Sequence, residues 1–401
     1  MAQLGRQKWP LKTGSRASPI SSKMIIYLSA MTKGGARTTR AARLTVDLGA
    51  LGENYQTMRD KSAGAETAAV VKADAYGLGL AHVVPELLNA GTRVFFVAQE
   101  EEGHALRALT PDADIYVLNG LPPGAAADFA AAALRPCLIS LDQISEWQTF
   151  CRTTQAHPAC VFVDTGFNRL GLDETDLLAL HADPTHFDGW TLALIASHLA
   201  CADNPEHPMN RAQLEKFRYA RDLLPPAPAS LANSGGVLMG ADFCFDMTRI
   251  GISLYGGSPH ANHTTALSCV VRLDAPILQT RTLGEGDTVG YGATFTAAHD
   301  MTIGIVGLGY GDGVLRSLGS RDAGLVRVAI DGHDVPIVGR VSMDTLAVDL
   351  TDLDEMASPG DMVEIFGPNN PIDRLATQGQ TLSYELLTGL GGRYNRIYTG
   401  N

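Results

Sequence analysis

The sequence predicts an α/β protein, in which an N-terminal (β/α)8 barrel of the TIM type is followed by a smaller, mainly antiparallel β domain. From residue 44 onward, short runs rich in Val, Ile and Ala alternate with amphipathic stretches, which is typical of a parallel sheet covered by helices. Eight such runs occur before residue 255, and eight is the strand count of a closed barrel. A doubly wound open sheet is the alternative for this part of the chain.

The predicted barrel strands are short apolar runs that end in polar or small residues. In chain order they are Ala68–Val71, Val94–Val97, Ile115–Leu118, Pro136–Ser140, Cys160–Asp164, Leu192–His198, Leu231–Asn233 and Arg249–Leu254. Between them, amphipathic periodicity predicts helices at Glu101–Leu109, Asp173–His181 and Gln213–Leu224, and the alanine-rich stretch 124–134 reads as a further barrel helix.

The predicted secondary structure changes after about residue 270. The segments 269–283, 301–311, 325–344 and 361–367 are β-rich, with Gly and Asp at the expected turns and few helical stretches between them. We therefore assign 44–270 to the barrel and 271–401 to the β domain. Residues 1–43 hold nine of the 31 Lys and Arg side chains and no acidic residue. We expect them to be a disordered extension or a misassigned start, with Met24 or Met31 as the true first residue, rather than a targeting segment.

Composition limits the function classes. The net charge is −12, and because the leader is basic the rest of the chain is more acidic still, which argues against nucleic acid as the partner. No apolar run is long enough to span a bilayer. The six cysteines show no metal-ligand spacing, so we expect no metal site and a reducing, cytoplasmic location.

Unusual polar residues follow several of the predicted strands. Lys72 ends the first one, and "DTGFNR", "SHLACAD" and "ANSGG" end three later ones, while an arginine lies near the start of "TRIGISLYGG". In a (β/α)8 barrel the carboxyl ends of all strands meet at one rim, where active sites lie. These residues are therefore predicted to converge on one site.

Two glycine-containing loops at this rim suit an anion. Ser234 and the glycines after it stand where a helix should begin, and Gly251 gives a second place where backbone can approach a ligand. A phosphate cradle near a strand-end lysine fits pyridoxal phosphate, which such a lysine binds covalently through its amine.

Eight motifs then identify a resemblance. "VVKADAYGLG", "VDTGFNRLGL", "SHLACAD", "ANSGG", "TRIGISLYGG", "VGYGATF", "GLGYGDG" and "GRVSMD" occur in the order and spacing of the alanine racemases, across residues 44–398. The resemblance implies pyridoxal phosphate as cofactor and interconversion of L- and D-alanine, for peptidoglycan synthesis or alanine degradation. It implies Lys72 as the cofactor lysine and the base on one face of the substrate, with Tyr291 as the acid or base on the other. Tyr291 would come from the β domain of a second subunit, which requires a homodimer.

The remaining site residues are also implied by the resemblance. Phosphate ligands would be Tyr76, Ser234, Gly251 and Ile252. Substrate contacts would be Arg169, the backbone of Met343 from the partner, and Tyr310 in the entry channel. Arg249 would hydrogen-bond the pyridine nitrogen and leave it unprotonated, because an arginine keeps its own proton. His198 would lie behind the site, and together with Arg249 act as a nearby cation that favours a phenolate.

Two positions depart from the family pattern. Many alanine racemases carry a carbamylated lysine that orients the arginine, and Phe162 stands there, so a bound anion, a carboxylate or a rearranged loop must position Arg169. Many also have a C-terminal tyrosine as a phosphate ligand, for which the matching slot is taken to be Gly392.

Other functions stay open at this point. A broad-specificity racemase or a decarboxylase could use the same scaffold, although a decarboxylase would be expected to place a glutamate where Arg249 stands. A non-catalytic pyridoxal phosphate carrier would need the barrel alone, which the region after residue 270 argues against.

Overall fold

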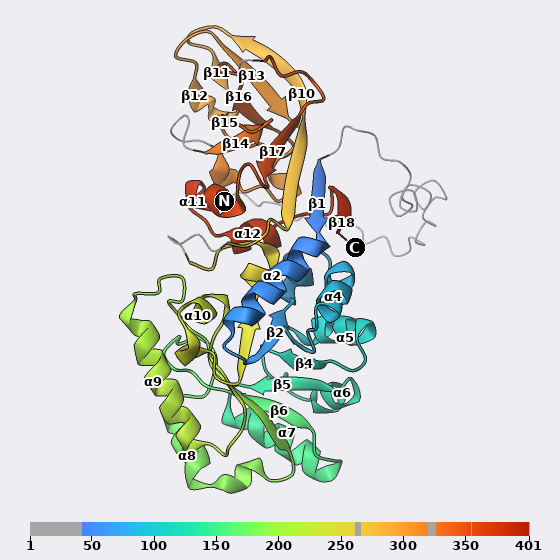
Figure 1. Cartoon of the computed structure of the whole chain (residues 1–401), viewed down its shortest axis with the longest axis vertical. Helices are drawn as coiled ribbons and strands as arrows, with labels where there is room; N and C mark the ends of the chain where they lie inside the picture. The colour runs from blue at the N-terminus through green and yellow to red at the C-terminus, as the bar shows by residue number, and fades with distance from the viewer. Residues whose placement is uncertain (1–41, 261–265, 320–325, 354, 401) are drawn as a thin grey trace, which may run out of the picture. The chain divides into compact units, whose positions relative to one another are not determined.

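The structure is a computed structural model that describes residues 42–260, 266–319, 326–353 and 355–400. The predicted extension 1–43 lies outside the described residues except for its last two positions. Among the helices that are described, none is both long and apolar enough to cross a membrane. The described strands form two eight-stranded sheets and one small hairpin (Figure 1).

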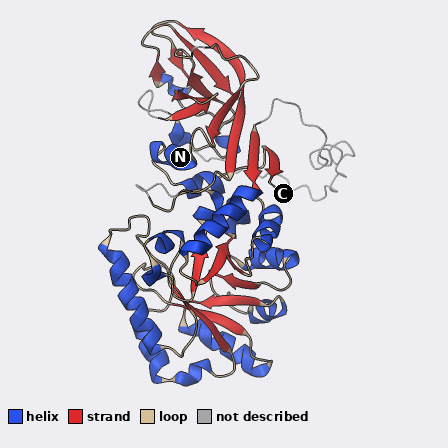
Figure 2. Ribbon diagram, in the orientation of Figure 1, coloured by secondary structure: helices blue, strands red, loops and turns tan. Residues whose placement is uncertain are grey.

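The first sheet consists of parallel strands that alternate with helices along the chain (Figure 2). Its strands pair in the order β8-β7-β6-β5-β4-β3-β2-β9. Their bounds are β2 Glu66–Val70, β3 Val94–Val97, β4 Asp114–Val117, β5 Leu134–Leu138, β6 Pro158–Phe162, β7 Thr191–Ala196, β8 Ala229–Ser230 and β9 Met247–Ile250. β3 and β6 are wholly apolar, and β4, β5 and β7 each carry a single polar residue, which matches a sheet buried on both faces.

The sheet comes back on itself through its two outer strands. A parallel bridge joins Asn233, just after β8, to Arg249 in β9, and the Arg249 amide donates to the Ala232 carbonyl at 2.9 Å. The predicted (β/α)8 barrel is thereby confirmed over the open-sheet alternative. One predicted strand is too long, because β9 ends at Ile250 and the chain continues as the 3-10 helix η3, Ile252–Tyr255.

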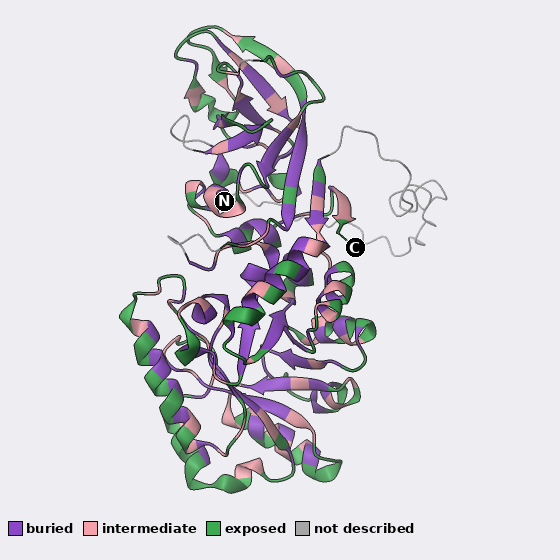
Figure 3. Cartoon of the chain, in the orientation of Figure 1, coloured by how far each residue is buried: buried purple, intermediate pink, exposed green. Residues whose placement is uncertain are grey.

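Helices cover the outside of the barrel with one buried and one exposed face (Figure 3). They begin at recognisable caps: Ser140 accepts from the Gln143 amide, and Asp173 accepts from the Asp176 amide. The helices are α2 Leu48–Lys61, α3 Lys72–Tyr76, α4 Leu80–Asn89, α5 Glu100–Leu109, α6 Ala126–Ala131, α7 Leu141–Thr153, α8 Glu174–Ala182, α9 Pro208–Leu223 and α10 Ser234–Leu238, with 3-10 turns η1 Pro184–Phe187 and η2 Ala241–Phe243.

The second sheet is built mainly from the C-terminal part of the chain and is antiparallel except for one pair, as predicted. Its strands include β10 Val271–Leu283, β13 Met301–Val306, β14 Arg327–Ile330, β15 His333–Val338, β16 Leu346–Asp349, β17 Met362–Phe366 and β18 Asn395–Thr399. A small hairpin, β11 Thr288–Val289 and β12 Phe295–Thr296, accompanies it, as do α11 Ile372–Gln378, α12 Ser383–Thr388 and the 3-10 turns η4 Tyr291–Ala293, η5 Tyr310–Asp312 and η6 Arg316–Leu318.

One strand of this second sheet comes from the start of the described chain. β1, Arg43–Asp47, pairs antiparallel with β10 and parallel with β18. Residues 44–47, predicted to belong to the barrel segment, therefore form part of the second sheet. Its alternating burial pattern fits a strand in a sheet with one face covered.

Candidate active site

Lys72 lies at the rim of the barrel, directly after β2, at the start of a tight turn. Residues 73–76, none of them glycine, all have φ between 54° and 55°, so the turn is left-handed. Each L-residue in this conformation costs about 1–2 kcal/mol, because its β-carbon approaches the following carbonyl oxygen. Such strain persists only where the surroundings over-determine the backbone, and it is concentrated at functional sites.

The Lys72 amine has no ion pair and no hydrogen bond within the described residues. Burial lowers its pKa, and the positive charges of Arg169 and Arg249 lower the pKa further, against the opposing effect of Glu102. A partly buried amine with a lowered pKa is more often neutral, and a neutral amine is a nucleophile toward a carbonyl carbon.

Arg249 is a buried cation, 3% exposed, whose hydrogen-bond partners are all neutral. One nitrogen of the guanidinium donates to the Ser230 carbonyl at 2.8 Å and to its hydroxyl at 2.6 Å, and the other to the Ser197 carbonyl at 2.5 Å. Burial lowers the Arg249 pKa to about 10. Since no described carboxylate pairs with it, the site is positively charged and suits an anionic ligand.

His198 corrects one expectation. Its Nδ1 lies 3.4 Å from a guanidinium nitrogen of Arg249, and its ring packs near the Phe167 ring. Burial lowers the His198 pKa to about 3, with further lowering by the charges of Arg249, Arg169 and Lys72. Burial and these charges favour the uncharged imidazole, which argues against the predicted role of His198 as a cation and leaves Arg249 as the buried positive charge of the two.

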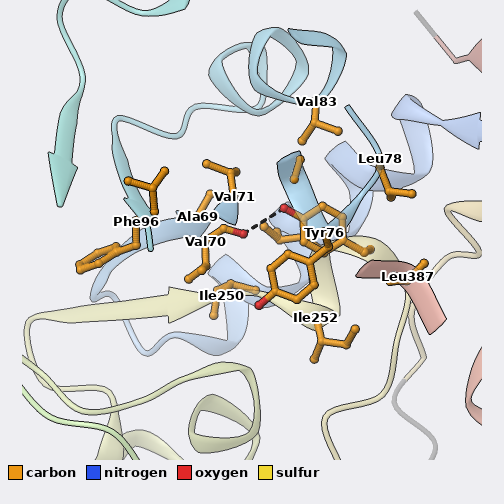
Figure 4. Packing of buried hydrophobic residues seen from close by; sticks show 14 of the residues in the cluster. Ala69, Val70, Val71, Tyr76, Leu78, Val83, Phe96, Ile250, Ile252 and Leu387 are labelled. Atoms are coloured by element: carbon orange, nitrogen blue, oxygen red, sulfur yellow. Dashed lines mark hydrogen bonds between the residues drawn. The ribbon is translucent and has the colours of Figure 1, made fainter. Parts of the chain in front are cut away.

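The predicted phosphate residues converge. The Gly251 amide donates to the Ser234 hydroxyl at 3.0 Å, and a β-carbon on Gly251 would collide with the Tyr76 hydroxyl. Tyr76 packs among Val70, Ile250 and Ile252 (Figure 4). Its hydroxyl has no hydrogen-bond partner in the described part of the chain, and burial keeps its pKa well above the ordinary value. It is thus an unused neutral donor facing a glycine backbone, which fits an anion cradle.

Arg169 is oriented by an aromatic ring. Its guanidinium carbon lies 4.0 Å from the centre of the Phe167 ring, and within the described ranges no carboxylate pairs with it. The loop that carries both residues folds around Asp164, whose carboxylate accepts the amides of residues 166, 167 and 168 at 2.8–3.1 Å. Phe162, where a carbamylated lysine was expected, is buried at the end of β6. Of the predicted substitutes, a rearranged loop contact agrees with this geometry.

Tyr384 lies near the predicted phosphate residues although no sequence motif indicated it. Its ring on α12 lies 6.1 Å from the Tyr76 ring, whereas a β-carbon on Gly392 would have no neighbour within 4 Å. Tyr384 is therefore a tyrosine of the C-terminal region that lies beside Tyr76 in the structure, while the match of the family's tyrosine slot to Gly392 stays a prediction. The glycine at position 77 is the sequence feature that could have indicated this packing. Its φ is 82°, and it approaches the Leu387 carbonyl so closely that no side chain fits where α12 packs.

Three predicted residues lie in the second sheet's connections. Tyr291 is 71% exposed, and Tyr310 and Met343 are also exposed. The Tyr310 amide donates to the Ser342 carbonyl at 3.0 Å, and the Gly311 amide donates to the Met343 carbonyl at 2.8 Å. Tyr310 and Met343 therefore lie on two segments that are hydrogen-bonded to each other. No contact among the described residues joins any of the three to Lys72.

Comparison with known proteins decides the family. The family model described as "Alanine racemase, N-terminal domain" matches residues 46–259, and "Alanine racemase, C-terminal domain" matches 270–398. The chain belongs to the alanine racemase family. It is 46% identical to the alanine racemase of Rhizobium meliloti (strain 1021) over 90% of this chain and 97% of that one. It is 44% identical to a biosynthetic alanine racemase of Agrobacterium fabrum (strain C58 / ATCC 33970), covering 89% and 92%.

A solved structure of the same family agrees with the fold. The alanine racemase from Bartonella henselae, described with covalently bound pyridoxal phosphate, superposes with a TM-score of 0.85 at 42% identity, covering 90% of this chain and 99% of that one. The matched part of this chain includes both the barrel and the second sheet.

Proposed function

We propose that this protein racemises alanine, interconverting the L and D forms with pyridoxal phosphate as cofactor. One observation carries the proposal: the strand-end amine of Lys72 has no partner in the described chain and stands in a positively charged rim beside the cradle of Tyr76, Ser234 and Gly251. The family to which the chain belongs supports the same reaction.

The donor set fits the cofactor. Lys72 would bind it covalently, the backbone of Gly251 and Ile252 with Ser234 and the hydroxyl of Tyr76 would hold its phosphate, and Arg249 would donate to its ring nitrogen. When bound, pyridoxal phosphate supplies the electron sink that makes the Cα proton acidic. An arginine donor, unlike a carboxylate, leaves the ring nitrogen unprotonated, which weakens that sink and disfavours side reactions.

Racemisation requires two proton-transfer groups, one on each face of the substrate. Lys72 would take or return the Cα proton on one face, and its lowered pKa makes a neutral amine available for this role. Tyr291 would act on the opposite face. Because it is exposed and has no contact with Lys72 in its own chain, we propose that it comes from a second copy, together with Met343. Arg169, held against Phe167, would bind the substrate carboxylate, and Tyr310 would line the entry.

We therefore propose a homodimer with two composite sites, which works in the cytoplasm on D-alanine for peptidoglycan or in alanine breakdown. A broad-specificity racemase is the second candidate function.

Borohydride reduction followed by peptide mass mapping tests the cofactor assignment. The cofactor mass should appear on Lys72, and labelling of another lysine would overturn that assignment. A substrate panel with chiral detection tests the reaction. Alanine should racemise at least tenfold faster than serine or arginine, while similar rates would favour the broad-specificity alternative and no turnover would support a carrier.

A further inference from the structure

Glu102, on the barrel helix α5, contacts the Lys72 turn from a neighbouring element. One carboxylate oxygen accepts the amide of Ala73 at 2.6 Å, and Ala73 is the residue directly after Lys72. The other oxygen accepts the amides of Ala98 and Gln99 at 2.7 and 3.1 Å, at the start of its own helix. Glu102 thus splits its two oxygens between α5 and the turn.

The barrel topology explains why this glutamate can reach the turn. β2 and β3 are neighbouring parallel strands, and the Val71 amide donates to the Phe96 carbonyl at 2.9 Å. The turn after β2 and the start of α5 after β3 therefore lie at the same rim. The capping box between Gln99 and Glu102 holds the carboxylate in place at the third position of α5.

The turn needs such a partner. Ala73 has a φ of 54°, a left-handed conformation that L-amino acids disfavour. Because its side chain is exposed, side-chain packing does not hold Ala73 in this conformation. Within the turn, the Ala75 amide reaches the Val71 carbonyl and the Gly77 amide reaches the Ala73 carbonyl, at 2.9 and 2.7 Å. The Ala73 amide is the donor that the carboxylate from α5 satisfies.

We propose that Glu102 is a positioning residue of this site, which fixes the left-handed turn through the Ala73 amide and so sets the backbone from which Lys72 extends. The inference rests on the proposed function for the role of Lys72. Its negative charge also acts on the Lys72 amine, in opposition to Arg169 and Arg249. Two effects on one lysine, backbone restraint and charge, thus come from a single side chain.

Hydrogen–deuterium exchange on the full-length holoenzyme tests the restraint directly. In Glu102→Gln, the amides of residues 72–80 should exchange at least tenfold faster, and the Kd for pyridoxal phosphate should rise about tenfold. Gln99→Ala removes the other half of the capping box and serves as the helix control, and Glu101→Gln serves as the charge control. Both should stay within twofold of the wild type. Unchanged exchange in Glu102→Gln would overturn the proposal.

A second substitution separates positioning from helix capping. Ala73→Gly relieves the left-handed conformation, because glycine adopts positive φ at no steric cost. Added to Glu102→Gln, it should return the Kd to within threefold of the wild type, and no recovery would overturn the proposal. Should Glu102→Gln fail to fold, Glu102→Asp carries the same test, since its shorter side chain keeps the charge near α5 and cannot reach Ala73. Borohydride labelling away from Lys72 would defeat the proposed function and leave the exchange result on the turn intact.

Discussion

Arg249 and His198 form a pair in which a guanidinium nitrogen lies 3.4 Å from Nδ1 of the imidazole, and burial first, then the charge of Arg249, lowers the His198 pKa. The Nδ1 atom of His198 can accept a hydrogen bond from Arg249, and protonation of the imidazole is disfavoured because it would place a second positive charge beside the guanidinium. The imidazole Nδ1 is therefore one of several neutral acceptors around the Arg249 guanidinium, beside the carbonyls of Ser197 and Ser230.

The His198 pKa predicts a loss of stability in acid. The unfolded chain binds a proton at this histidine near pH 6.5, whereas the folded chain does so only near pH 3, so the free energy of unfolding falls as the pH drops through that window. The slope from this group is at most about 1.4 kcal/mol per pH unit. Urea unfolding at pH 7.5, 6 and 5 should show a shallower decline in His198→Gln than in wild type. His333→Gln, at an exposed site on β15, should keep the wild-type slope, and identical slopes in all three proteins would contradict the prediction.

Substituting Tyr291 should separate the two directions of the reaction. Tyr291→Phe should slow removal of the Cα proton from L-alanine by about 10²–10⁴-fold, the usual contribution of a general acid or base. Loss of deuterium from labelled L- and D-alanine measures each direction. Tyr219→Phe, an exposed tyrosine on α9, is the control. Equal rates in Tyr291→Phe and wild type would remove Tyr291 from the mechanism.

The cradle should not tolerate a β-carbon at Gly251. In Gly251→Ala the new methyl group would meet the Tyr76 hydroxyl, and a forced shift of this kind costs about 1–3 kcal/mol. The Kd for pyridoxal phosphate should rise tenfold or more, as fluorescence titration can measure. Gly392→Ala is matched in chemistry but has open space around it, so it should bind like the wild type. Equal affinity in both variants would argue against the cradle.

Gln213 should prove important for stability although it is outside the cofactor cradle. This fully buried side chain on α9 donates to the His198 carbonyl at 2.9 Å and to the Thr165 hydroxyl at 3.1 Å, and it accepts the Ala200 amide at 2.8 Å. Gln213→Leu would leave these groups unpaired and should lower the free energy of unfolding by about 3 kcal/mol. Lys216→Gln, exposed on the same helix, should change it by less than about 0.5 kcal/mol. Chemical denaturation measures both.

Most barrel strands could be predicted because each is a local apolar run, and the observed ends differ from the predicted ones by a few residues. The exception is β8, Ala229–Ser230, which lies just before the predicted run Leu231–Asn233. β9 was drawn too long because apolar residues continue past Ile250 into η3. β1 could not be found from its own five residues, since its partners are β10 and β18, more than 200 positions away.

The same limit applied to the site. Lys72, Ser234 and Gly251 follow or precede strands and could be placed from the order of the elements. The left-handed turn could not, because "KADAY" favours an ordinary right-handed helix and only distant contacts impose the other hand. Tyr384 depended on how α12 packs beside Tyr76, which no local pattern encodes.

The C-terminal strand β18 contacts the turn after Lys72 but is synthesised much later than that turn. The Arg396 guanidinium donates to the Gly77 carbonyl at 2.6 Å and the Tyr398 hydroxyl to the Leu78 carbonyl at 2.8 Å, across 319 and 320 positions of sequence. At ordinary ribosomal speeds those partners emerge on the order of half a minute after the turn they hold. A growing chain can therefore form much of its barrel before these two hydrogen bonds hold the end of the turn that follows Lys72.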